Sequence, residues 1–403
     1  MNLTGIRSLD DIEVEGKTVF VRVDFNVPLD GKTITDDARI RAALPTITAL
    51  RDAGAVVVLA SHMGRPKGKV DPALSLEPAA ARLAELLESD VLFTDDCVGD
   101  GVKKVIKDAN AGDVILLENL RFRDAEKAND PLFAKALASL ADVYVNDAFG
   151  TSHRKHASTY GMVEHFDDDQ VAMGYLVRRE LEFLSPLLYQ PKSPYVAIMG
   201  GAKVSDKIKV IENLLGRVDH LLIGGAMAYT FLAAQDVPVG TSLVERDKVQ
   251  LARTLLDRAA QANTTIVLPI DHGVAPSFES AERTNTEGTA IPDGYMALDI
   301  GPKTVISFSN IIAEASTVIW NGPVGLFERE PFHVGTFAIA NAVADNKNAL
   351  SVVGGGDSAA AILAAGRAED VSHVSTGGGA SLTFLEGVDL PGIAALRAGH
   401  RFD

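Results

Sequence analysis

The sequence predicts an α/β protein built from two doubly wound domains, each with a parallel sheet. Short apolar runs alternate with amphipathic stretches along the 403 residues, and this rhythm occurs twice. Apolar runs of this length between helical stretches are typical of buried parallel strands in βαβ units. Right-handed crossovers then place helices on both faces of each sheet. The chain length independently favours two domains.

The first half begins with an expected strand at Lys17–Val23 and a helix at Asp37–Asp52. The other elements expected there are strands at Ala55–Ala60, Val91–Thr94, Val114–Leu117 and Asp142–Asn146, and helices at Glu77–Glu88 and Pro131–Leu140. The strands expected in the second half are Tyr195–Met199, His220–Ile223, Thr265–Leu268, Thr317–Trp320, Leu350–Val353 and Ser372–Ser375.

Between the halves lies a charged and apolar stretch, Val171–Leu188, which we interpret as one helix that joins the domains. Pro186 and Pro191 are expected to mark its end and the linker that follows. The sequence therefore predicts domains at residues 1–172 and 173–389.

Charge and cysteine content narrow the partners and the compartment. The formal net charge is −16, which argues against nucleic acid or an anionic membrane as a partner. This acidity is typical of a solvated surface, and adaptation to high salt stays open as a second interpretation. The single cysteine, Cys97, cannot form an internal disulfide and favours a reducing compartment such as the cytoplasm. No apolar run reaches the roughly 18 residues of a membrane span.

Glycine clusters follow four apolar runs of the second half. These clusters are Gly200–Gly201, Gly224–Gly225, Gly354–Gly356 and Gly377–Gly379. Glycine lets backbone N–H groups approach a ligand closely, and a helix N-terminus after it favours phosphate. The pattern predicts a nucleotide site, although no segment fits the Walker A motif. Gly354–Ala359 also fits a loose Gly-x-Gly-x-x-Ala pattern, so an NAD-linked dehydrogenase is an alternative.

Basic side chains gather near the strand ends of the first half. They are Arg39, Arg41, His62, Arg65, Arg121, Arg123, His153, Arg154 and His156, together with Arg22, which lies within an expected strand. The carboxyl ends of parallel strands share one edge of a sheet, so several of these groups should meet there. Arginine forks match carboxylate and phosphate geometry. The cluster predicts a small, multiply charged anionic substrate. A non-enzymatic anion-binding protein is the second alternative.

At these residues the sequence resembles the phosphoglycerate kinase family over nearly its whole length. The resemblance rests on the segments RVDFNVP (Arg22–Pro28), DDARI (Asp36–Ile40), SHMGRP (Ser61–Pro66), ENLRF (Glu118–Phe122), NDAFGTSHRKHAS (Asn146–Ser158), MGGAKVSDKI (Met199–Ile208), WNGPVGLFE (Trp320–Glu328), GGGDSAA (Gly354–Ala360) and STGGGASLTFLEG (Ser375–Gly387). They occur in the family's order and spacing.

The resemblance implies two similar-sized, Rossmann-like domains separated by a cleft. It implies reversible phosphoryl transfer between 1,3-bisphosphoglycerate and ADP, which gives 3-phosphoglycerate and ATP. The first domain would bind 3-phosphoglycerate, and the second would bind ADP or ATP with Mg²⁺. The tail, residues 390–403, would pack on the first domain. The family also suggests a monomer, and its chemistry suggests that the two domains close around both substrates.

Site roles follow from the matching motifs. In the first domain, Asp24 and Asn26 would hold the substrate's hydroxyl and carboxylate, and Arg39 would lie against the transferring phosphoryl group. His62, Arg65, Arg121 and Arg154 would complete the substrate site. The residues implied for the nucleotide are Gly201, Lys203, Lys207, Gly225, Asn321, Glu328, Gly354, Gly355, Gly356, Asp357 and Ser358.

Within the nucleotide site, the resemblance assigns Lys203 and Gly356, with Arg39, to catalysis and Asp357 to Mg²⁺. Lys207 and Asn321 would meet the phosphates, Glu328 the ribose, and Gly201 and Gly225 the base and ribose pocket. Two segments depart from the family pattern. Ser205 stands where Ala is common, and Pro269–Glu279 follows the pattern only loosely, which leaves the adenine contacts open.

The residues also fit the chemistry. A carboxylate nucleophile has an ordinary pKa near 4, so at neutral pH its attack needs no general base. Positive groups must hold two anions together, with Arg39 from one domain and Lys203 from the other. Lys203 and Lys207 are four residues apart and are expected to share one helical face near its N-terminus. Asp357 should open a helix, where it could also be the N-cap.

Overall fold

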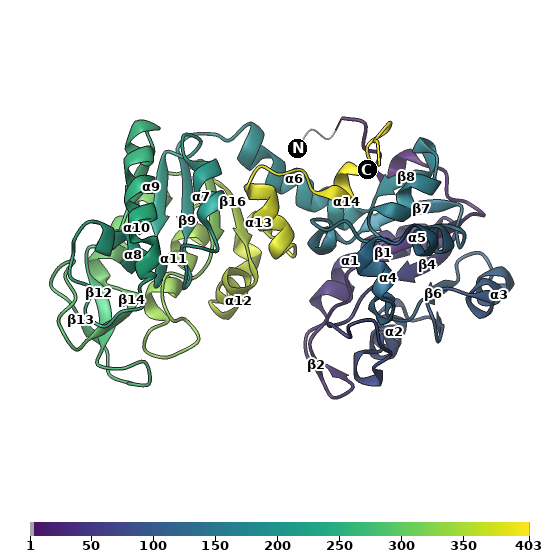
Figure 1. Cartoon of the computed structure of the whole chain (residues 1–403), viewed down its shortest axis with the longest axis horizontal. Coiled ribbons are helices and arrows are strands. Elements are labelled where there is room, and N and C mark those ends of the chain that lie inside the picture. Colours follow the sequence, from purple (N-terminus) through teal and green to yellow (C-terminus); the bar gives the residue numbers. More distant parts are fainter. Residues whose placement is uncertain (1–3, 403) are drawn as a thin grey trace. The chain divides into compact units, whose positions relative to one another are not determined.

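Two six-stranded sheets form the framework of the computed structural model, which describes residues 4–402 (Figure 1). The chain divides into two units. The first contains the residues up to Glu182 together with those from Asp389 onward, and the second is Phe183–Val388. Each unit contains one of the two sheets. The predicted α/β class with two parallel, doubly wound sheets is therefore confirmed.

The first sheet has the strand order β5-β6-β4-β1-β7-β8, and every neighbouring pair is parallel. Its strands are β1 (Thr18–Val23), β4 (Val56–Ala60), β5 (Val91–Phe93), β6 (Val114–Leu116), β7 (Val143–Asp147) and β8 (Val171–Met173). The order changes direction between β1 and β7. Loops that leave these two strands turn to opposite faces of the sheet, and the space between them is where ligands bind in such folds.

Helices and a small hairpin complete the first unit. Its helices are α1 (Ala38–Asp52), α2 (Glu77–Leu87), α3 (Asp100–Asp108), α4 (Asp124–Ala128), α5 (Pro131–Ala138) and α14 (Pro391–Ala394), and its hairpin pairs β2 (Leu29–Asp30) with β3 (Thr33–Ile34). Helix α5 shows how the sequence sets a boundary. Asp130 accepts a hydrogen bond from Phe133 N at 2.9 Å, and Pro131 occupies the first helical position, where no N–H is needed.

The second sheet has the order β11-β10-β9-β15-β16-β17, again wholly parallel. Its strands are β9 (Tyr195–Met199), β10 (His220–Ile223), β11 (Thr265–Val267), β15 (Thr317–Asn321), β16 (Leu350–Gly354) and β17 (His373–Val374). Counted along the unit, this is the order 3-2-1-4-5-6 of dinucleotide-binding folds. The direction changes between β9 and β15, both of which are buried along their whole length.

Two pairs of helices, α8 with α9 and α10 with α11, pack against one another in the second unit (Figure 1). The helices described there are α7 (Ile208–Leu214), α8 (Met227–Ala234), α9 (Val249–Gln261), α10 (Pro302–Ala313), α11 (Val334–Asp345), α12 (Gly356–Ala364) and α13 (Gly379–Leu385). A three-stranded antiparallel sheet, which the sequence analysis did not predict, is formed by β12 (His272–Ala275), β13 (Thr284–Asn285) and β14 (Met296–Ile300).

All eleven strands predicted from apolar runs are confirmed to within one residue at each end. The prediction of a single helix at Val171–Leu188 was wrong. The first three residues of this stretch form β8, because they pair with β7 at the edge of the sheet and bury their apolar side chains there. The helix, α6, runs from Tyr175 to Tyr189 and contains Pro186 in its interior. A proline there removes one backbone hydrogen bond, which the last turn of this helix tolerates.

Asp147, at the end of β7, caps the first turn of α6. Its Oδ1 accepts hydrogen bonds from Leu176 N at 2.9 Å and Val177 N at 3.4 Å, while Thr46 Oγ1 accepts one from Tyr175 N at 2.9 Å. A Cβ at position 174 would lie 2.2 Å from Asp147 Oδ1, so only glycine fits before the helix. Burial raises the pKa of Asp147 to about 7.

Replacing this cap should destabilise the first unit. Asp147→Ala should lower the free energy of unfolding by about 1–2 kcal/mol, because the N–H groups of α6 lose their acceptor. Asp147→Asn keeps one acceptor oxygen and should lose less. Urea denaturation followed by circular dichroism measures both, with the exposed Asp169→Ala as the control. Equal midpoints for Asp147→Ala and Asp169→Ala would contradict the capping role.

Candidate functional site

The loops at the carboxyl end of the first sheet bring together most of the basic residues predicted from the sequence. Asp24 and Asn26 follow β1, and His62 follows β4. Arg121 follows β6, and Arg154 lies in the loop that follows β7. These strands are neighbours in the sheet around its switch point, so the loops meet at one edge.

A buried asparagine, Asn119, fixes two of these loops to each other. Its Oδ1 accepts hydrogen bonds from Met63 N at 3.1 Å and Arg121 N at 3.0 Å, and its Nδ2 donates to Met63 O at 2.8 Å. Gly64 has a φ of 58° and its N–H donates to Asn26 Oδ1 at 2.8 Å. Arg121 Nη1 donates to Gly64 O at 2.8 Å. The Arg121 guanidinium is therefore held by a backbone carbonyl and not by a carboxylate.

Arg39, from the first turn of α1, lies over the end of β1. Its Nη1 donates to Asp24 Oδ2 at 3.2 Å and to the Asn26 carbonyl at 3.0 Å. The other oxygen of Asp24 lies 3.7 Å from His62 Nδ1. The side chain of Arg39 is 38% exposed and that of Asp24 only 14%. Part of the Arg39 guanidinium therefore stays accessible to a ligand.

Arg22 is fully buried within β1 and packs beneath this site, next to His62. Its Nε donates to Ser158 Oγ at 2.8 Å, and Ser158 Oγ donates in turn to Glu126 Oε1 at 2.6 Å. Arg22 Nη2 lies 3.3 Å from His62 Nδ1. The charge of Glu126 thus balances that of Arg22 through the serine hydroxyl. The neighbouring Arg39 and Arg121, by contrast, retain N–H groups that could bind a ligand.

Burial and like charges set the protonation of these groups. Burial, followed by the charges of Arg22, Arg121 and Arg154, holds the pKa of His62 well below its usual value. Burial and then Arg154 and Arg22 lower the pKa of Arg121 to about 10. At neutral pH His62 is therefore neutral, while the Arg121 guanidinium remains charged. The electrostatic cost of this crowding would be relieved by a bound anion.

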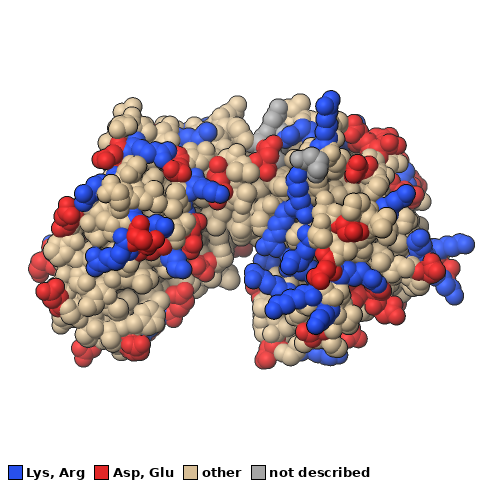
Figure 2. Space-filling view, viewed as in Figure 1, with Lys and Arg blue, Asp and Glu red and all other residues tan. Residues whose placement is uncertain are grey.

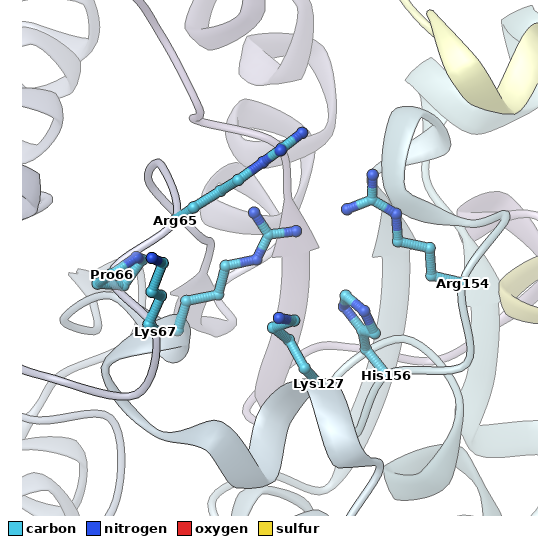
Figure 3. Close-up of a pocket in the computed structure, with 7 residues that line it drawn as sticks. Arg65, Pro66, Lys67, Lys127, Arg154 and His156 are labelled. Carbon is cyan, nitrogen blue, oxygen red and sulfur yellow. The ribbon is translucent and has the colours of Figure 1, made fainter.

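A pocket of about 330 Å³ opens among these cations, as Figure 3 shows. Its lining consists of Arg65, Pro66, Lys67, Arg121, Lys127, Arg154 and His156. Lys67 and Lys127 were missed by the sequence analysis, although they lie just after the SHMGRP and ENLRF segments. Lys and Arg gather on this side of the first unit in Figure 2. We call these seven residues the basic pocket.

Four arginines of the predicted cluster do not line the basic pocket, namely Arg22 and Arg39, which are described above, and Arg41 and Arg123. Arg41 pairs with Asp37 at 2.8 Å, four residues before it, and Arg123 pairs with Asp96. Each has a carboxylate partner at a solvated surface, which is the ordinary role of such a residue. The spacing of Arg41 from Asp37 on α1 could have revealed its pairing.

In the second unit, glycine loops meet at the switch point between β9 and β15. A Cβ on Gly200 would lie 2.0 Å from Pro323 O, and a Cβ on Gly322 would lie 2.3 Å from Gly200 O. The two loops therefore require glycine for their close approach. Asn321 Nδ2 donates to Gly354 O at 2.8 Å. This bond connects the end of β16 to the two glycine loops. Asn321 is buried at this junction.

Lys207 lies against these loops. Its Nζ donates to the carbonyl of Asn321 at 2.7 Å and to Asn321 Oδ1 at 2.5 Å. Burial lowers the pKa of Lys207 to about 8, and the charges of Asp357 and Asp206 oppose that effect only in part. The ammonium group makes its two hydrogen bonds to uncharged acceptors. A phosphate placed beside it would supply the missing negative charge.

The expectation that Lys203 and Lys207 share a helical face was wrong. Helix α7 begins at Ile208, with Lys207 at its N-cap, and Lys203 lies in the preceding loop. Ser205 interrupts a helical path here, because its Oγ donates to Glu245 Oε1 at 2.6 Å and its N–H donates to Oε2 at 3.1 Å. Lys203 is exposed, whereas Lys207 is half-buried. The two ammonium groups therefore occupy different surroundings.

A second pocket, of about 360 Å³, lies beside the glycine loops and is mainly apolar. Its lining consists of Gly201, Ala202, Gly225, Ala226, Tyr229, Leu243, Phe278, Met296, Ala297, Leu298, Pro323, Gly325, Leu326, Glu328 and Asp357. We call it the apolar pocket. Phe278 comes from the segment whose match to the family was loose. Gly201, Gly225, Glu328 and Asp357 were predicted from the sequence.

Asp357 lies in the first turn of α12, which begins after Gly355 with a φ of 91°. The N-cap is Gly355, so the alternative that Asp357 is the N-cap is wrong. Ser358 is buried, and its Oγ accepts from Gly322 N at 2.6 Å and donates to Gly354 O at 2.8 Å. The Asp357 carboxylate is exposed at a helix start, beside a pocket.

Among residues 4–402, no group of three or more His, Cys, Asp or Glu side chains could hold a metal ion. Mg²⁺ nevertheless fits at Asp357, because this ion is commonly bound by one or two carboxylates together with phosphate oxygens and water. A complete protein cage would indicate a different metal. The single carboxylate beside the apolar pocket suits a metal that arrives with a phosphorylated ligand.

The comparisons with known proteins decide the family. The family model described as phosphoglycerate kinase matches residues 9–388. The chain belongs to the phosphoglycerate kinase family. The phosphoglycerate kinase of Anaeromyxobacter dehalogenans (strain 2CP-C) is 59% identical over 396 residues, which are 97% of this chain and 99% of the relative. That of Acidobacterium capsulatum is 55% identical over 399 residues, with 96% and 98% covered.

Solved structures agree with this family assignment. The phosphoglycerate kinase of Coxiella burnetii has a TM-score of 0.90 at 40% identity and covers 98% of this chain and 100% of that one. The phosphoglycerate kinase of Pyrococcus horikoshii OT3 has a TM-score of 0.84 at 36% identity, with 98% and 99% covered.

The family membership settles the class of activity. The chain is a phosphotransferase that acts on small molecules, and phosphoglycerate kinase chemistry implies a nucleotide as one substrate. Neither the dehydrogenase nor the non-enzymatic alternative is favoured. In the part of the chain that the structure describes, no helix is long and apolar enough to cross a membrane.

Proposed function

We propose that the basic pocket binds 3-phosphoglycerate or 1,3-bisphosphoglycerate and that the apolar pocket, with the glycine loops beside it, binds ADP or ATP. The observation that carries this proposal is the gathering of cations around the basic pocket in a chain of net charge −16. The strand order of the second unit and the glycine loops at its switch point support the nucleotide assignment. The first unit is then the triose domain and the second the nucleotide domain.

In the triose domain, Arg65, Arg121 and Arg154 would bind the non-transferring phosphate. Their support is the pocket itself, which carries several cations and no carboxylate in its lining. Asp24 and Asn26 would hold the hydroxyl and carboxylate ends of the substrate, with His62 as a neutral donor or acceptor beside Asp24. The 3.7 Å separation between His62 Nδ1 and Asp24 Oδ1 supports their action on one group.

In the nucleotide domain, the base would lie against the apolar pocket between Gly201 and Gly225, with Glu328 at the ribose hydroxyls. Apolar walls suit the faces of an adenine ring. Lys207 would bind the phosphates, and Asn321 would hold it there. The loop residues proposed to cradle the phosphates are Gly354, Gly355, Gly356, Asp357 and Ser358.

The reaction then needs no proton transfer. In the direction of ATP use, an oxygen of the 3-phosphoglycerate carboxylate attacks the terminal phosphorus of ATP. A bond forms between these two atoms, while the bond from that phosphorus to the bridging oxygen breaks, and ADP leaves. Arg39, Lys203 and the Gly356 N–H are the groups that would stabilise the charge of the transferring phosphoryl group. Burial and the charge of Arg22 hold the pKa of His62 well below its usual value and make it a weak base, which is consistent with a mechanism that has no general base.

Mg²⁺ would be held by Asp357 and the nucleotide phosphates, where it supplies charge neutralisation. The protein would then contribute only the position of that carboxylate, which the first turn of α12 fixes. We also propose that the enzyme works as a monomer in the cytoplasm. The single cysteine, buried at Cys97, supports a reducing compartment.

Removing either catalytic cation should slow turnover without unfolding the protein. Arg39→Ala and Lys203→Ala should each reduce kcat by about 10²–10³-fold, because each deletes a donor to the transferring group. A coupled assay with 3-phosphoglycerate and ATP measures this. Arg258→Ala and Lys135→Ala remove cations of the same kind from outer surfaces and serve as controls. A variant with wild-type kcat would take that residue out of the proposed role.

Nucleotide affinity should fall as the pH rises through the pKa of Lys207. With that pKa at about 8, the side chain is mostly charged below pH 8 and mostly neutral above it. ADP affinity should therefore decrease by about fivefold between pH 8 and pH 9, and binding at pH 8 should take up protons. Isothermal titration calorimetry in two buffers measures both effects. Lys207→Met should abolish the pH dependence, whereas the exposed Lys209→Met should retain it. Retention in Lys207→Met would assign the dependence to another group.

Loss of the Asp357 carboxylate should weaken the response to Mg²⁺. Asp357→Asn should raise the free Mg²⁺ concentration for half-maximal rate by about tenfold, since one anionic ligand is lost. Steady-state rates across a Mg²⁺ series at fixed ATP measure this. Asp206→Asn is the control, because Asp206 is an exposed carboxylate that also acts on Lys207. An identical Mg²⁺ midpoint in the two variants would refute the metal assignment.

A further inference from the structure

A buried ion pair, Arg283–Asp299, lies behind the wall of the apolar pocket and has no role in the chemistry above. Arg283 Nη1 donates to Asp299 Oδ2 at 2.7 Å. Their side chains are 12% and 0% exposed. Asp299 belongs to β14, where Met296 and Leu298 line the pocket. Ala297 lines the pocket with them, whereas Asp299 is absent from the lining and is fully buried.

Arg283 joins three segments of the chain. In addition to Asp299, its Nη1 donates to Pro331 O at 2.9 Å and its Nη2 donates to Ile300 O at 3.0 Å. A Cβ on Gly273, in β12, would lie 2.6 Å from Arg283 Nε, so the guanidinium also packs closely on that strand. Only a planar group with several donors can satisfy these acceptors at once.

Asp299 extends the same connection to the segment after β15. Its Oδ2 accepts a hydrogen bond from Gly335 N at 2.8 Å, in the first turn of α11. A Cβ on Gly325 or Gly335 would lie 2.1 or 2.3 Å from Asp299 Oδ1. Both glycines are therefore required for the carboxylate to fit between them. One side chain thus hydrogen-bonds to the segment at Gly335 and packs closely against it at Gly325.

This segment carries pocket residues of its own. Gly325, Leu326 and Glu328 line the apolar pocket, and Leu326 N donates to Leu298 O at 2.8 Å. The ion pair therefore sits behind both parts of one wall, the β14 side and the Gly325–Glu328 side. A buried pair of this kind is costly to form and is weak evidence for a role in stability alone.

We propose that Arg283 and Asp299 are positioning residues for the nucleotide, which set the distance between β14 and Glu328. This inference rests on the proposed function of the apolar pocket. It goes beyond that function by assigning nucleotide affinity to a pair that touches no substrate. Breaking the pair should let the Glu328 segment move away from β14, and displacement of binding groups by about 1 Å weakens binding and catalysis markedly.

The test separates nucleotide affinity from every other property. Arg283→Met should raise the KM for ATP and the Kd for ADP by about tenfold, while the KM for 3-phosphoglycerate stays within about twofold. Arg283→Lys keeps the charge and one donor but not the fork, so it should fall between wild type and Arg283→Met. Hydrogen exchange should become faster at residues 325–335 and 296–300. Arg253→Met, which removes an exposed arginine pair with Asp236 in the same unit, is the matched control and should change none of these.

Two outcomes overturn the inference. One is an unchanged KM for ATP in both Arg283 variants, and the other is an equal rise in the KM values for both substrates, which would indicate a purely structural role. If Arg283→Met does not fold, Arg283→Lys and Asp299→Asn supply the same comparison. Ala202→Trp, at an exposed pocket residue, tests the underlying proposal separately. Unchanged ADP affinity in Ala202→Trp would refute the nucleotide pocket itself, whereas lost affinity there with unaltered Arg283 variants would refute only the positioning role.

Discussion

The site in the first unit depends on holding like charges close together before any ligand arrives. Arg121 receives its fixed position from a backbone carbonyl and from Asn119, not from a carboxylate. Arg22 is the exception, because Glu126 balances it through Ser158. The difference is physical. A fully buried guanidinium needs a counter-charge, whereas one at a pocket wall can leave that place for the substrate.

The second unit is subject to a different constraint, because its loops approach one another closely at the switch point. Here the constraint is space, and glycine provides it at Gly200 and Gly322. The same loops carry few charges, and Lys207 is held by uncharged oxygens of Asn321. Burial therefore depresses its pKa more than nearby carboxylates raise it. The two units thus differ, because the first gathers an excess of positive charge, whereas the second packs glycine loops closely beside an ammonium group held by uncharged oxygens.

The sequence predicted what depends on local pattern. Every strand of the two main sheets except β8 could be located from its apolar run, since buried parallel strands are continuous in hydrophobicity. The small sheet of β12, β13 and β14 was not predicted, because its strands are short and partly polar. The start of α6 was misplaced because Val171–Met173 suits either a strand or a helix. Only pairing with β7 decides between them.

The candidate site divides in the same way. Motif residues such as Asp24, Arg121 and Asp357 lie at strand ends and could be found from the sequence. Lys67 and Lys127 could not be separated from surface lysines until the loops were folded together. The spacing of Lys203 and Lys207 suggested a helix, but Ser205 bonds to Glu245, 40 residues away, and that tertiary contact overrides the local pattern.

The contact between Ser205 and Glu245 belongs with the Arg283–Asp299 pair as a long-range restraint on a loop that would bind substrate. Neither can be read from periodicity, because each joins a loop to an element distant in sequence or to a strand of the small sheet. The Arg283–Asp299 pair lies behind a wall whose front is glycine or apolar. The side chains on the pocket side of such walls offer few hydrogen bonds or ion pairs that could fix their position. Their geometry must therefore come from the residues behind, and these residues govern affinity without touching the ligand.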